Sequence, residues 1–262
     1  MPVKKCPLCL ETKNVVVSHM MPAAMYDYCR PPGGHNLSVS SDLVIESDRQ
    51  LKHSLLCNDC EQNLNRGGET WILPLLARYK GPFPFHDLLT KIAPDVVDGD
   101  VKAYAAARNP EIDCEKIIHF ALGIFWKAGV HSWNRSRTAP LINLGVYAEP
   151  IRRFLRGEQG CPESIALTIG VLPPPVELIS FHNPYRGSNP SWPNFLFYVS
   201  GIEFALHLGP PVDSGIRESC FATNPLHPMM VLDFSPTIKD ILSEVWKKAH
   251  KAKNVEKYLK RH

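Results

Sequence analysis

The sequence has no long hydrophobic run. Its longest charge-free apolar stretch, Ile117 to Trp126, has about ten residues, whereas a membrane-spanning helix needs about 20. The N-terminus lacks the apolar segment and the cleavage site of a secretory signal. We therefore expect a cytoplasmic protein without a membrane partner. In that compartment cysteines are thiols or metal ligands rather than disulfide partners.

The sequence also has no large excess of charge, no internal repeat and no low-complexity tract. Its 262 residues carry a formal net charge of +3, and 44% of them are hydrophobic. This composition argues against a disordered chain, and it permits nucleic-acid binding without requiring it. The 24 prolines, roughly twice the average share, predict much irregular backbone.

The eight cysteines are unevenly distributed along the chain. Cys6 and Cys9 form one Cys-x-x-Cys pair, and Cys57 and Cys60 form a second. Two such pairs supply four thiolates, which is the ligand set of a closed tetrahedral zinc site. We therefore predict a structural Zn²⁺ ion on these four residues. Four reduced core cysteines and a dithiol redox pair are the alternatives, although no βαβ pattern surrounds either pair.

A histidine follows a short β-branched run between the two cysteine pairs. The run Val15–Val17 predicts a strand that ends at His19. A histidine with an ordinary pKa takes a proton from water at neutral pH, so His19 is a candidate general base. The alternative is a histidine that packs beside the cysteines or bonds a carbonyl. His53, on the strand predicted before Cys57, is a candidate ligand for a metal or a phosphate.

Oxygen-bearing side chains follow the second cysteine pair. The composition predicts a helix over residues 59–66, and Gly67-Gly68 are expected to end it. Glu61, Asn65 and Glu69 are spaced four residues apart, which places them on one helix face. Carboxylate and amide oxygens are ligands for Mg²⁺ or Mn²⁺. A solvated helix face is the alternative interpretation.

These pieces resemble the HNH family of ββα-metal endonucleases. The resemblance covers about residues 3 to 72, with softer similarity at residues 125–128 and 144–147. It rests on three segments: Cys6-x-x-Cys9, then Ser18-His19-Met20-Met21-Pro22, then Leu56-Cys57-x-x-Cys60-Glu61 with its following Gly68-Glu69. The sequence departs from common members at three places. These are Ser18 in place of Asp, Glu61 in place of Asn or His, and Lys52-His53 in place of Asn-Leu.

The resemblance implies a function and a role for each residue. Zinc would hold the fold, His19 and Glu61 would be catalytic, and Asn65, Glu69 and His53 would help to bind Mg²⁺ or Mn²⁺. The implied reaction is hydrolysis of DNA phosphodiester bonds, in bacterial defence against phage or foreign DNA. Such a nuclease would need a restraint, either a regulatory partner protein, a modified-base requirement or an activating ligand, and a homo-oligomer is also a candidate assembly. The alternative, favoured by Ser18, is a zinc-stapled nucleic-acid-binding or protein-interaction module without catalysis.

We predict an α+β fold with two regions. Residues 1–72 would form the HNH-like, treble-clef-like zinc unit, and residues 73–262 an α+β region that recognises substrate or partner. Helices are predicted from Cys114 to Lys127, with Asp113 as its N-cap, and over residues 147–156. Strands are predicted over residues 164–172, 176–181, 196–200 and 201–208.

The chain is predicted to end in a long basic helix. Ser235-Pro236 would supply its first residues, and the helix would run to about Leu259. Its apolar residues recur at helical spacing, so one face would pack on the body while the lysines of the other face met DNA phosphates. A solvated amphipathic helix is the alternative.

Overall fold

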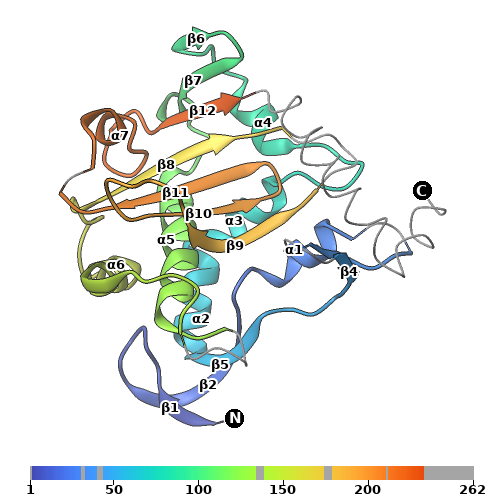
Figure 1. Cartoon of the computed structure of the whole chain (residues 1–262), viewed down its shortest axis with the longest axis vertical. Coiled ribbons are helices and arrows are strands. Elements are labelled where there is room, and N and C mark those ends of the chain that lie inside the picture. Colours follow the sequence, from blue (N-terminus) through green and yellow to red (C-terminus); the bar gives the residue numbers. More distant parts are fainter. Residues whose placement is uncertain are drawn as a thin grey trace.

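The computed structural model describes residues 2–30, 33–39, 44–133, 139–173, 179–210 and 212–232. Over these residues the chain is a mixed α+β protein, as the sequence predicted, with a seven-stranded sheet as its largest element (Figure 1). No helix among the described residues is long and apolar enough to cross a bilayer. The basic helix predicted from Ser235 to Leu259 lies outside the described residues.

The N-terminal part is a small antiparallel sheet followed by a helix. Its three strands, in spatial order, are β1 (Val3–Lys5), β2 (Thr12–His19) and β5 (Lys52–Cys57). Helix α2 (Asn58–Leu64) begins directly after β5. Between β2 and β5 the chain forms three short elements: α1 (Ala23–Tyr28), β3 (Leu37–Val39) and β4 (Val44–Glu46). The chain therefore leaves this sheet after β2 and returns to it at β5.

The helical run that begins at Asn58 does not end at the glycine pair, so that prediction was wrong. It continues through the π-helix η1 (Asn65–Glu69), α3 (Thr70–Ile72) and the 3₁₀-helix η2 (Leu73–Leu75). The glycines permit a close approach to another helix. A Cβ atom on Gly67 would overlap the ring of His119, and one on Gly68 would overlap the carbonyl of Lys116.

The seven-stranded sheet is antiparallel except for one parallel pair, β12 with β8. Its strands in spatial order are β6 (Val96–Asp98), β7 (Val101–Ala105), β12 (Pro228–Leu232), β8 (Ile165–Val171), β11 (Ile202–Leu208), β10 (Asn194–Val199) and β9 (Phe181–Arg186). The sequence around Pro184 suggests a proline-rich connection, but the structure has a strand there. Proline is compatible with a strand at this position because β9 is at the edge of the sheet.

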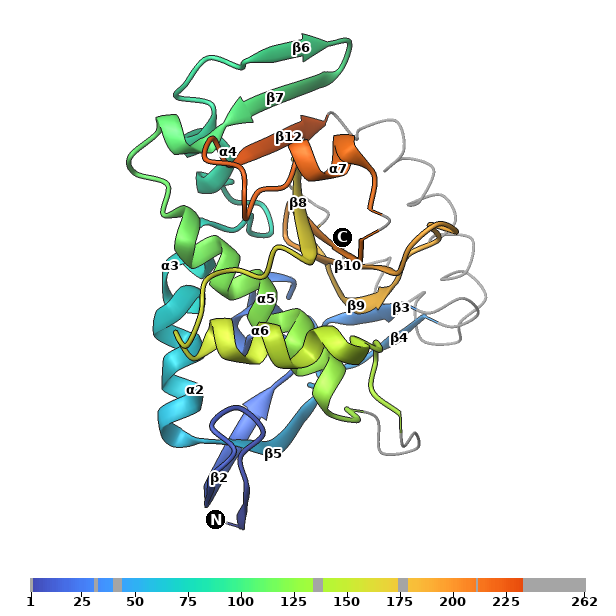
Figure 2. The same ribbon diagram turned by 90° about the vertical axis from the view of Figure 1, so that its left-hand side faces the viewer.

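Helix α5 (Cys114–Val130) is the central helix, and its prediction is confirmed. The side chain of Asp113 caps it by accepting a hydrogen bond from the backbone N–H of Lys116. Twelve of its 17 residues are buried, because the sheet lies on one side and η1 and α6 lie on others (Figures 1 and 2). Its contact with the sheet is an aromatic cluster of Phe120, Phe125, Phe197 and Phe204.

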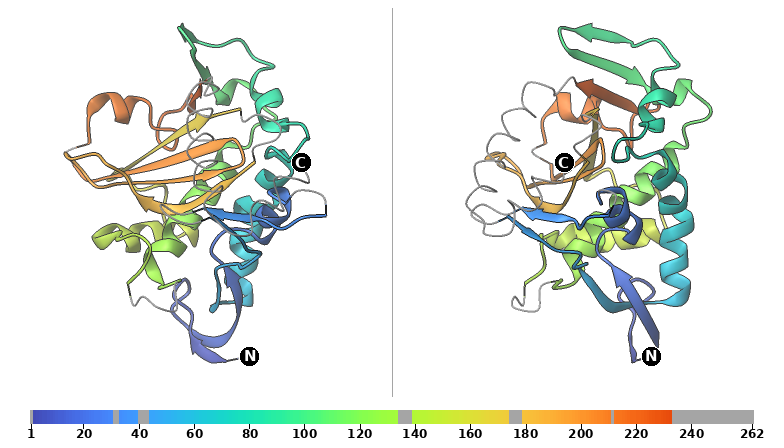
Figure 3. Two further views of the ribbon diagram at one scale, coloured as in Figure 1. Left: turned by 45° about the vertical axis from the view of Figure 1, so that its right-hand side comes forward. Right: turned by 90° about the vertical axis from the view of Figure 1, so that its right-hand side faces the viewer.

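The remaining helical elements are short. They are α4 (Pro84–Leu89), η3 (Ala106–Arg108), η4 (Gly145–Tyr147), α6 (Ala148–Leu155) and α7 (Ser214–Glu218). The β1–β2 hairpin lies at one end of the molecule and the β6–β7 hairpin at the other (Figure 3). Helix α6 was predicted over residues 147–156 and is confirmed with slightly shorter bounds.

One continuous cluster of buried apolar side chains joins the two predicted regions. It includes Cys6, Leu8 and Cys60 of the N-terminal part together with the sheet residues Phe204 and Val231. The predicted boundary between residues 72 and 73 falls inside the helical run from α2 to η2. The division of the chain into two regions stays a prediction.

Candidate metal centre and adjoining cleft

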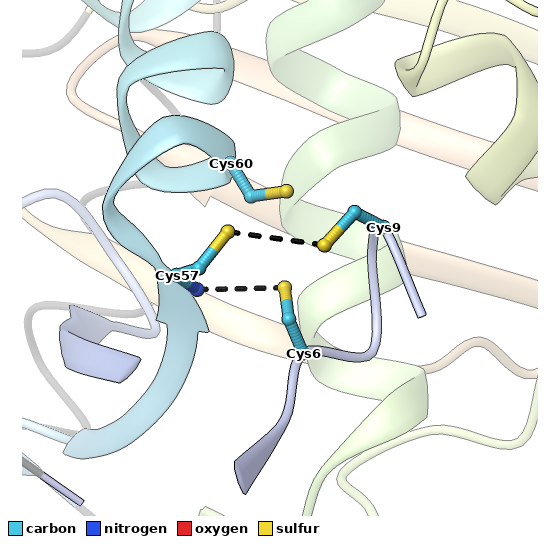
Figure 4. Close-up of side chains that lie close together, drawn as sticks. All are labelled: Cys6, Cys9, Cys57 and Cys60. Carbon is cyan, nitrogen blue, oxygen red and sulfur yellow. Dashed lines mark hydrogen bonds between the residues drawn. The ribbon is translucent and has the colours of Figure 1, made fainter. Parts of the chain in front are cut away.

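The four cysteines of the two pairs converge on one point (Figure 4). Their Sγ atoms all lie within 4.8 Å of one another, and those of Cys9 and Cys57 are 3.8 Å apart. A tetrahedral zinc ion with Zn–S distances of about 2.3 Å would place its sulfurs about 3.8 Å apart. Cys6, Cys57 and Cys60 are buried and Cys9 is half-buried. The arrangement is compatible with one structural zinc ion, as the sequence predicted.

Two local structures bring the sulfurs together. The first pair lies in the tight turn between β1 and β2, where the N–H of Leu10 donates to the carbonyl of Cys6. Leu10 adopts a φ of 66°, in the left-handed region that favours glycine. The second pair lies at the start of α2, where Cys57 is the N-cap residue. The positive end of a helix favours thiolates at this position.

The sulfurs differ in how readily they lose their protons, because the pKa of Cys6 is lowered while those of Cys9 and Cys60 are raised. A hydrogen bond from Cys60 lowers the pKa of Cys6 to about 4 against the effect of burial, and the backbone N–H of Cys57 also contributes. Burial raises the pKa of Cys9. Four thiolates this close repel one another unless a cation lies between them. A divalent ion therefore supplies what this donor set lacks.

His19 is the last residue of β2, as the sequence predicted, and is half-buried. It is opposite Lys52 in the register between β2 and β5. Burial lowers the pKa of His19, and the charges of Lys52 and Lys127 add to this, while a hydrogen bond with Gln50 opposes it. These effects favour the neutral imidazole, which is the form that accepts a proton.

Glu61 is held by a neighbouring serine rather than left open to solvent. The hydroxyl of Ser18, which is fully buried, donates to Oε2 of Glu61 over 2.6 Å, and the N–H of Leu56 donates to the same hydroxyl over 3.3 Å. Burial raises the pKa of Glu61. Ser18 thus ties the end of β2 to helix α2.

Glu69 forms a buried ion pair with a lysine of α5. The Nζ atom of Lys127 lies 3.2 Å from Oε1 of Glu69 and donates to the carbonyl of His19 over 3.1 Å. The side chain of Lys127 is 3% exposed and that of Glu69 is 14% exposed. A buried charge requires such partners because its loss of hydration is costly. The ammonium therefore links the π-helix, α5 and the end of β2.

The remaining predicted ligands do not complete a second metal site. Asn65 is half-buried on η1, and His53 is exposed on β5, with its ring 4.4 Å from that of His131. Within the described part of the chain, only the four cysteines bring three or more His, Cys, Asp or Glu ligand atoms together. His19, His53, Glu61 and Glu69 form no such group, and both glutamates already have partners. This donor set does not fit a hard divalent ion, so the structure does not support the predicted Mg²⁺ or Mn²⁺ site.

A cleft of about 650 Å³ adjoins His19 on the β5 side. Residues 48–53 form one wall, and Ser132 and Trp133 contribute to the other. Lys52, the cross-strand partner of His19, and Gln50, which forms a hydrogen bond with His19, are part of the first wall. His19 therefore lies beside this cleft.

The cleft has an excess of positive charge. Its acidic lining residue, Asp48, is paired with Arg30 and with His35, whose Nδ1 lies 2.5 Å from the carboxylate. Arg49 and Lys52 are exposed, and neither forms an ion pair with the residues that the structure describes. These two side chains are thus available to an anionic ligand.

Lys127 and the cleft residues are the features that sequence reasoning missed. Lys127 carries a signal in the sequence, because it is a charged residue inside a helix that is apolar on nearly all sides. Such a residue requires a buried partner, but nothing in the spacing identifies Glu69 as that partner. Arg49 precedes the strand β5 and has no local pattern that distinguishes it from other surface cations.

Comparisons of the chain with models of protein families, with curated proteins and with solved structures found no match. The function of this chain is therefore inferred from its residues and their geometry.

Proposed function

We propose that this protein hydrolyses phosphodiester bonds in DNA, with His19 as the general base on a zinc-held scaffold. The observation that carries the proposal is the position of His19: a half-buried imidazole opposite Lys52, beside a cleft whose two exposed cations have no ion pair among the described residues. The resemblance to HNH endonucleases supports DNA as the substrate and bacterial defence as the setting. Control by a regulatory partner protein belongs to the same proposal.

The proposed reaction uses groups that lie close together. His19 takes a proton from water, the water oxygen forms a bond to phosphorus, and the bond from phosphorus to the leaving sugar oxygen breaks. The leaving oxygen takes a proton from solvent, and the imidazolium returns its proton to solvent. Arg49 and Lys52 would bind the phosphate charge at the cleft. Zinc on the four cysteines would hold β2 and α2 in place and take no part in the chemistry.

The proposal is tested by nicking of supercoiled plasmid with zinc-loaded protein. His19→Ala should reduce the rate by about 10² or more, the range for a positioned acid–base group. Its zinc content should stay at one equivalent because His19 is not a cysteine ligand. His86→Ala, a histidine of α4, is the matched control and should retain the rate. Full activity of His19→Ala would rule out this mechanism.

A second candidate function is DNA binding without cleavage. It is favoured by one observation, that both glutamates beside His19 are already occupied by Ser18 and Lys127. Binding that survives in a protein unable to nick DNA would support it. Under either function Arg49→Glu with Lys52→Glu should weaken binding and reduce its salt dependence, by about one unit of slope for each lost phosphate contact.

A further inference from the structure

The ammonium of Lys127 lies among the groups that the resemblance assigns to a second metal ion. It contacts the carbonyl of His19 and the carboxylate of Glu69, and its charge also acts on Glu61. The carbonyl of Lys127 itself accepts a hydrogen bond from the indole N–H of Trp133, over 2.8 Å. Trp133 lines the cleft. One residue therefore connects the histidine, the acidic side chain and the cleft wall.

The charges in this space leave little room for a divalent cation. Glu69 has its negative charge compensated by Lys127, and Oε2 of Glu61 is bonded to Ser18. An added Mg²⁺ or Mn²⁺ ion on these carboxylates would meet the repulsion of a buried ammonium within hydrogen-bond distance of one of them. The ammonium of Lys127 is therefore already the cation among these donor groups.

We propose that Lys127 takes the place of the second metal ion, as a positioning residue that holds the backbone of His19 and compensates Glu69, so that the His19 site needs no Mg²⁺ or Mn²⁺. This inference rests on the proposed function for its catalytic consequence, but its structural part stands without it. Lys127 is too buried to touch a substrate, so it acts through His19. Contact with the phosphate is left to Arg49 and Lys52.

The first test measures the titration of His19 by NMR in zinc-loaded protein. The charged groups that act on its imidazole are Lys52, Lys127 and Glu69, and Gln50 bonds to it. Lys127→Met removes a positive charge and should raise the pKa of His19. Glu69→Gln removes a negative charge, keeps an acceptor for Lys127, and should lower it. A purely structural role of Lys127 would not shift the pKa of His19 in opposite directions in the two variants.

Lys116→Met is the matched control for this titration. Lys116 is on the same helix, but its side chain is 41% exposed and pairs with Asp113. This variant should leave the pKa of His19 where it is in the unaltered protein. If Lys127→Met does not fold, Glu69→Gln still tests the proposal, because an unchanged or raised pKa of His19 in that variant would overturn it.

The second test counts bound Mn²⁺ by electron paramagnetic resonance and measures nicking in chelator-treated buffer. Zinc-loaded protein should bind no Mn²⁺ at submillimolar concentration, and its nicking rate should change by less than about twofold when Mg²⁺ or Mn²⁺ is added. Lys127→Met should nick about 10²-fold more slowly, with its pH profile shifted to higher pH. One tightly bound Mn²⁺ that is lost in Glu69→Gln would overturn the proposal.

These outcomes separate the two proposals. If the protein nicks DNA only with Mg²⁺ or Mn²⁺, the result supports the proposed nuclease activity and contradicts the proposed role of Lys127. If the protein nicks no DNA under any condition, the proposed nuclease activity is wrong. Opposite shifts of the pKa of His19 in the two variants would still support the proposed structural role of Lys127.

Discussion

Arg152 is a buried guanidinium that joins α6 to the first cysteine pair. Its side chain is 9% exposed, and it donates to the carbonyl of Leu8 over 2.8 Å. Glu149 and Glu158 compensate its charge through bonds of 2.8 and 3.0 Å. Leu8 lies between the two cysteines of the turn. The guanidinium thus holds in place the turn that carries Cys6 and Cys9.

We predict that Arg152→Met lowers the free energy of unfolding by about 1–3 kcal/mol, since it leaves the buried carbonyl of Leu8 without its charged donor. The affinity for zinc, measured by competition with a chelator, should fall with it. Arg153→Met is the control, because Arg153 is half exposed and its nearest carboxylate is 3.9 Å away. That change should stay within about 0.5 kcal/mol. Equal effects of the two variants would contradict this role for Arg152.

At the scale of elements, the contact between η1 and α5 depends on two glycines. The nearest atoms to an added Cβ at Gly68 are the backbone carbonyl of Lys116 and the Cβ of Phe120. Backbone atoms of a buried helix cannot move aside as a flexible side chain can. The glycine pair is therefore a packing requirement of the interface that brings Glu69 to Lys127.

Gly68→Ala should destabilise the protein by about 1–3 kcal/mol through overpacking, although alanine is the better helix former by about 1 kcal/mol. The measurement is urea unfolding followed by circular dichroism. Gly123→Ala, on the same helix α5, provides the control, because its added Cβ would meet Leu64 of α2 at 3.6 Å, an ordinary contact. That variant should be neutral or stabilised. A gain of stability in Gly68→Ala would show that η1 and α5 are not held this closely.

The elements that sequence could predict are those with a local signal. The cysteine spacing predicted the four-cysteine cluster, which could bind a metal ion, and the apolar composition with Asp113 predicted α5. The π-helix was missed because a glycine pair usually ends a helix, and only the approach of α5 explains why it does not. Strand β9 was missed because Pro184 indicates a connection unless the strand is known to be at an edge.

The candidate site was predictable only in part: the sequence places His19 and Glu61, but it identifies neither Lys127 and the cleft residues nor the pairing of these groups. His19 does stand at the end of a strand, and Glu61 does lie on the adjoining helix. Their partners are distant in sequence, however: Ser18 is 43 residues from Glu61, and Lys127 is 58 residues from Glu69. Ion pairs over such separations follow from the tertiary fold, and no periodicity in one sequence reveals them.

At the scale of the whole molecule, the metal centre is part of the main core. Cys6, Cys57 and Cys60 belong to the same apolar cluster as α5 and the large sheet. Lys127 and Arg152 add polar bonds from α5 and α6 to the N-terminal part. Sequence reasoning divides the chain at residue 72, which suggests that loss of zinc would unfold only the first region. The shared core favours a different outcome.

We predict that Cys57→Ser, or removal of zinc by a chelator, weakens the whole molecule rather than the first 70 or so residues. Hydrogen exchange followed by mass spectrometry should show lost protection in α5 and β11 together with β2 and α2. The physical reason is that apolar surface on α5 is covered from one side by the helical run α2–η2, so that loosening this run exposes α5 to water. Cys161→Ser, at a cysteine outside the metal centre, should keep one equivalent of zinc and the original protection.

The alternative outcome is as informative, because it locates the boundary between cooperative units. If β8 and β11 kept full protection while β2 and α2 exchanged freely, the sheet would fold on its own and the division near residue 72 would be physical. The Lys127–Glu69 pair would then connect two units that open independently. Zinc would in that case control whether the carbonyl of His19 keeps its hydrogen bond from Lys127. Protection lost together means instead that zinc, the central helix and the position of His19 depend on one cooperative transition.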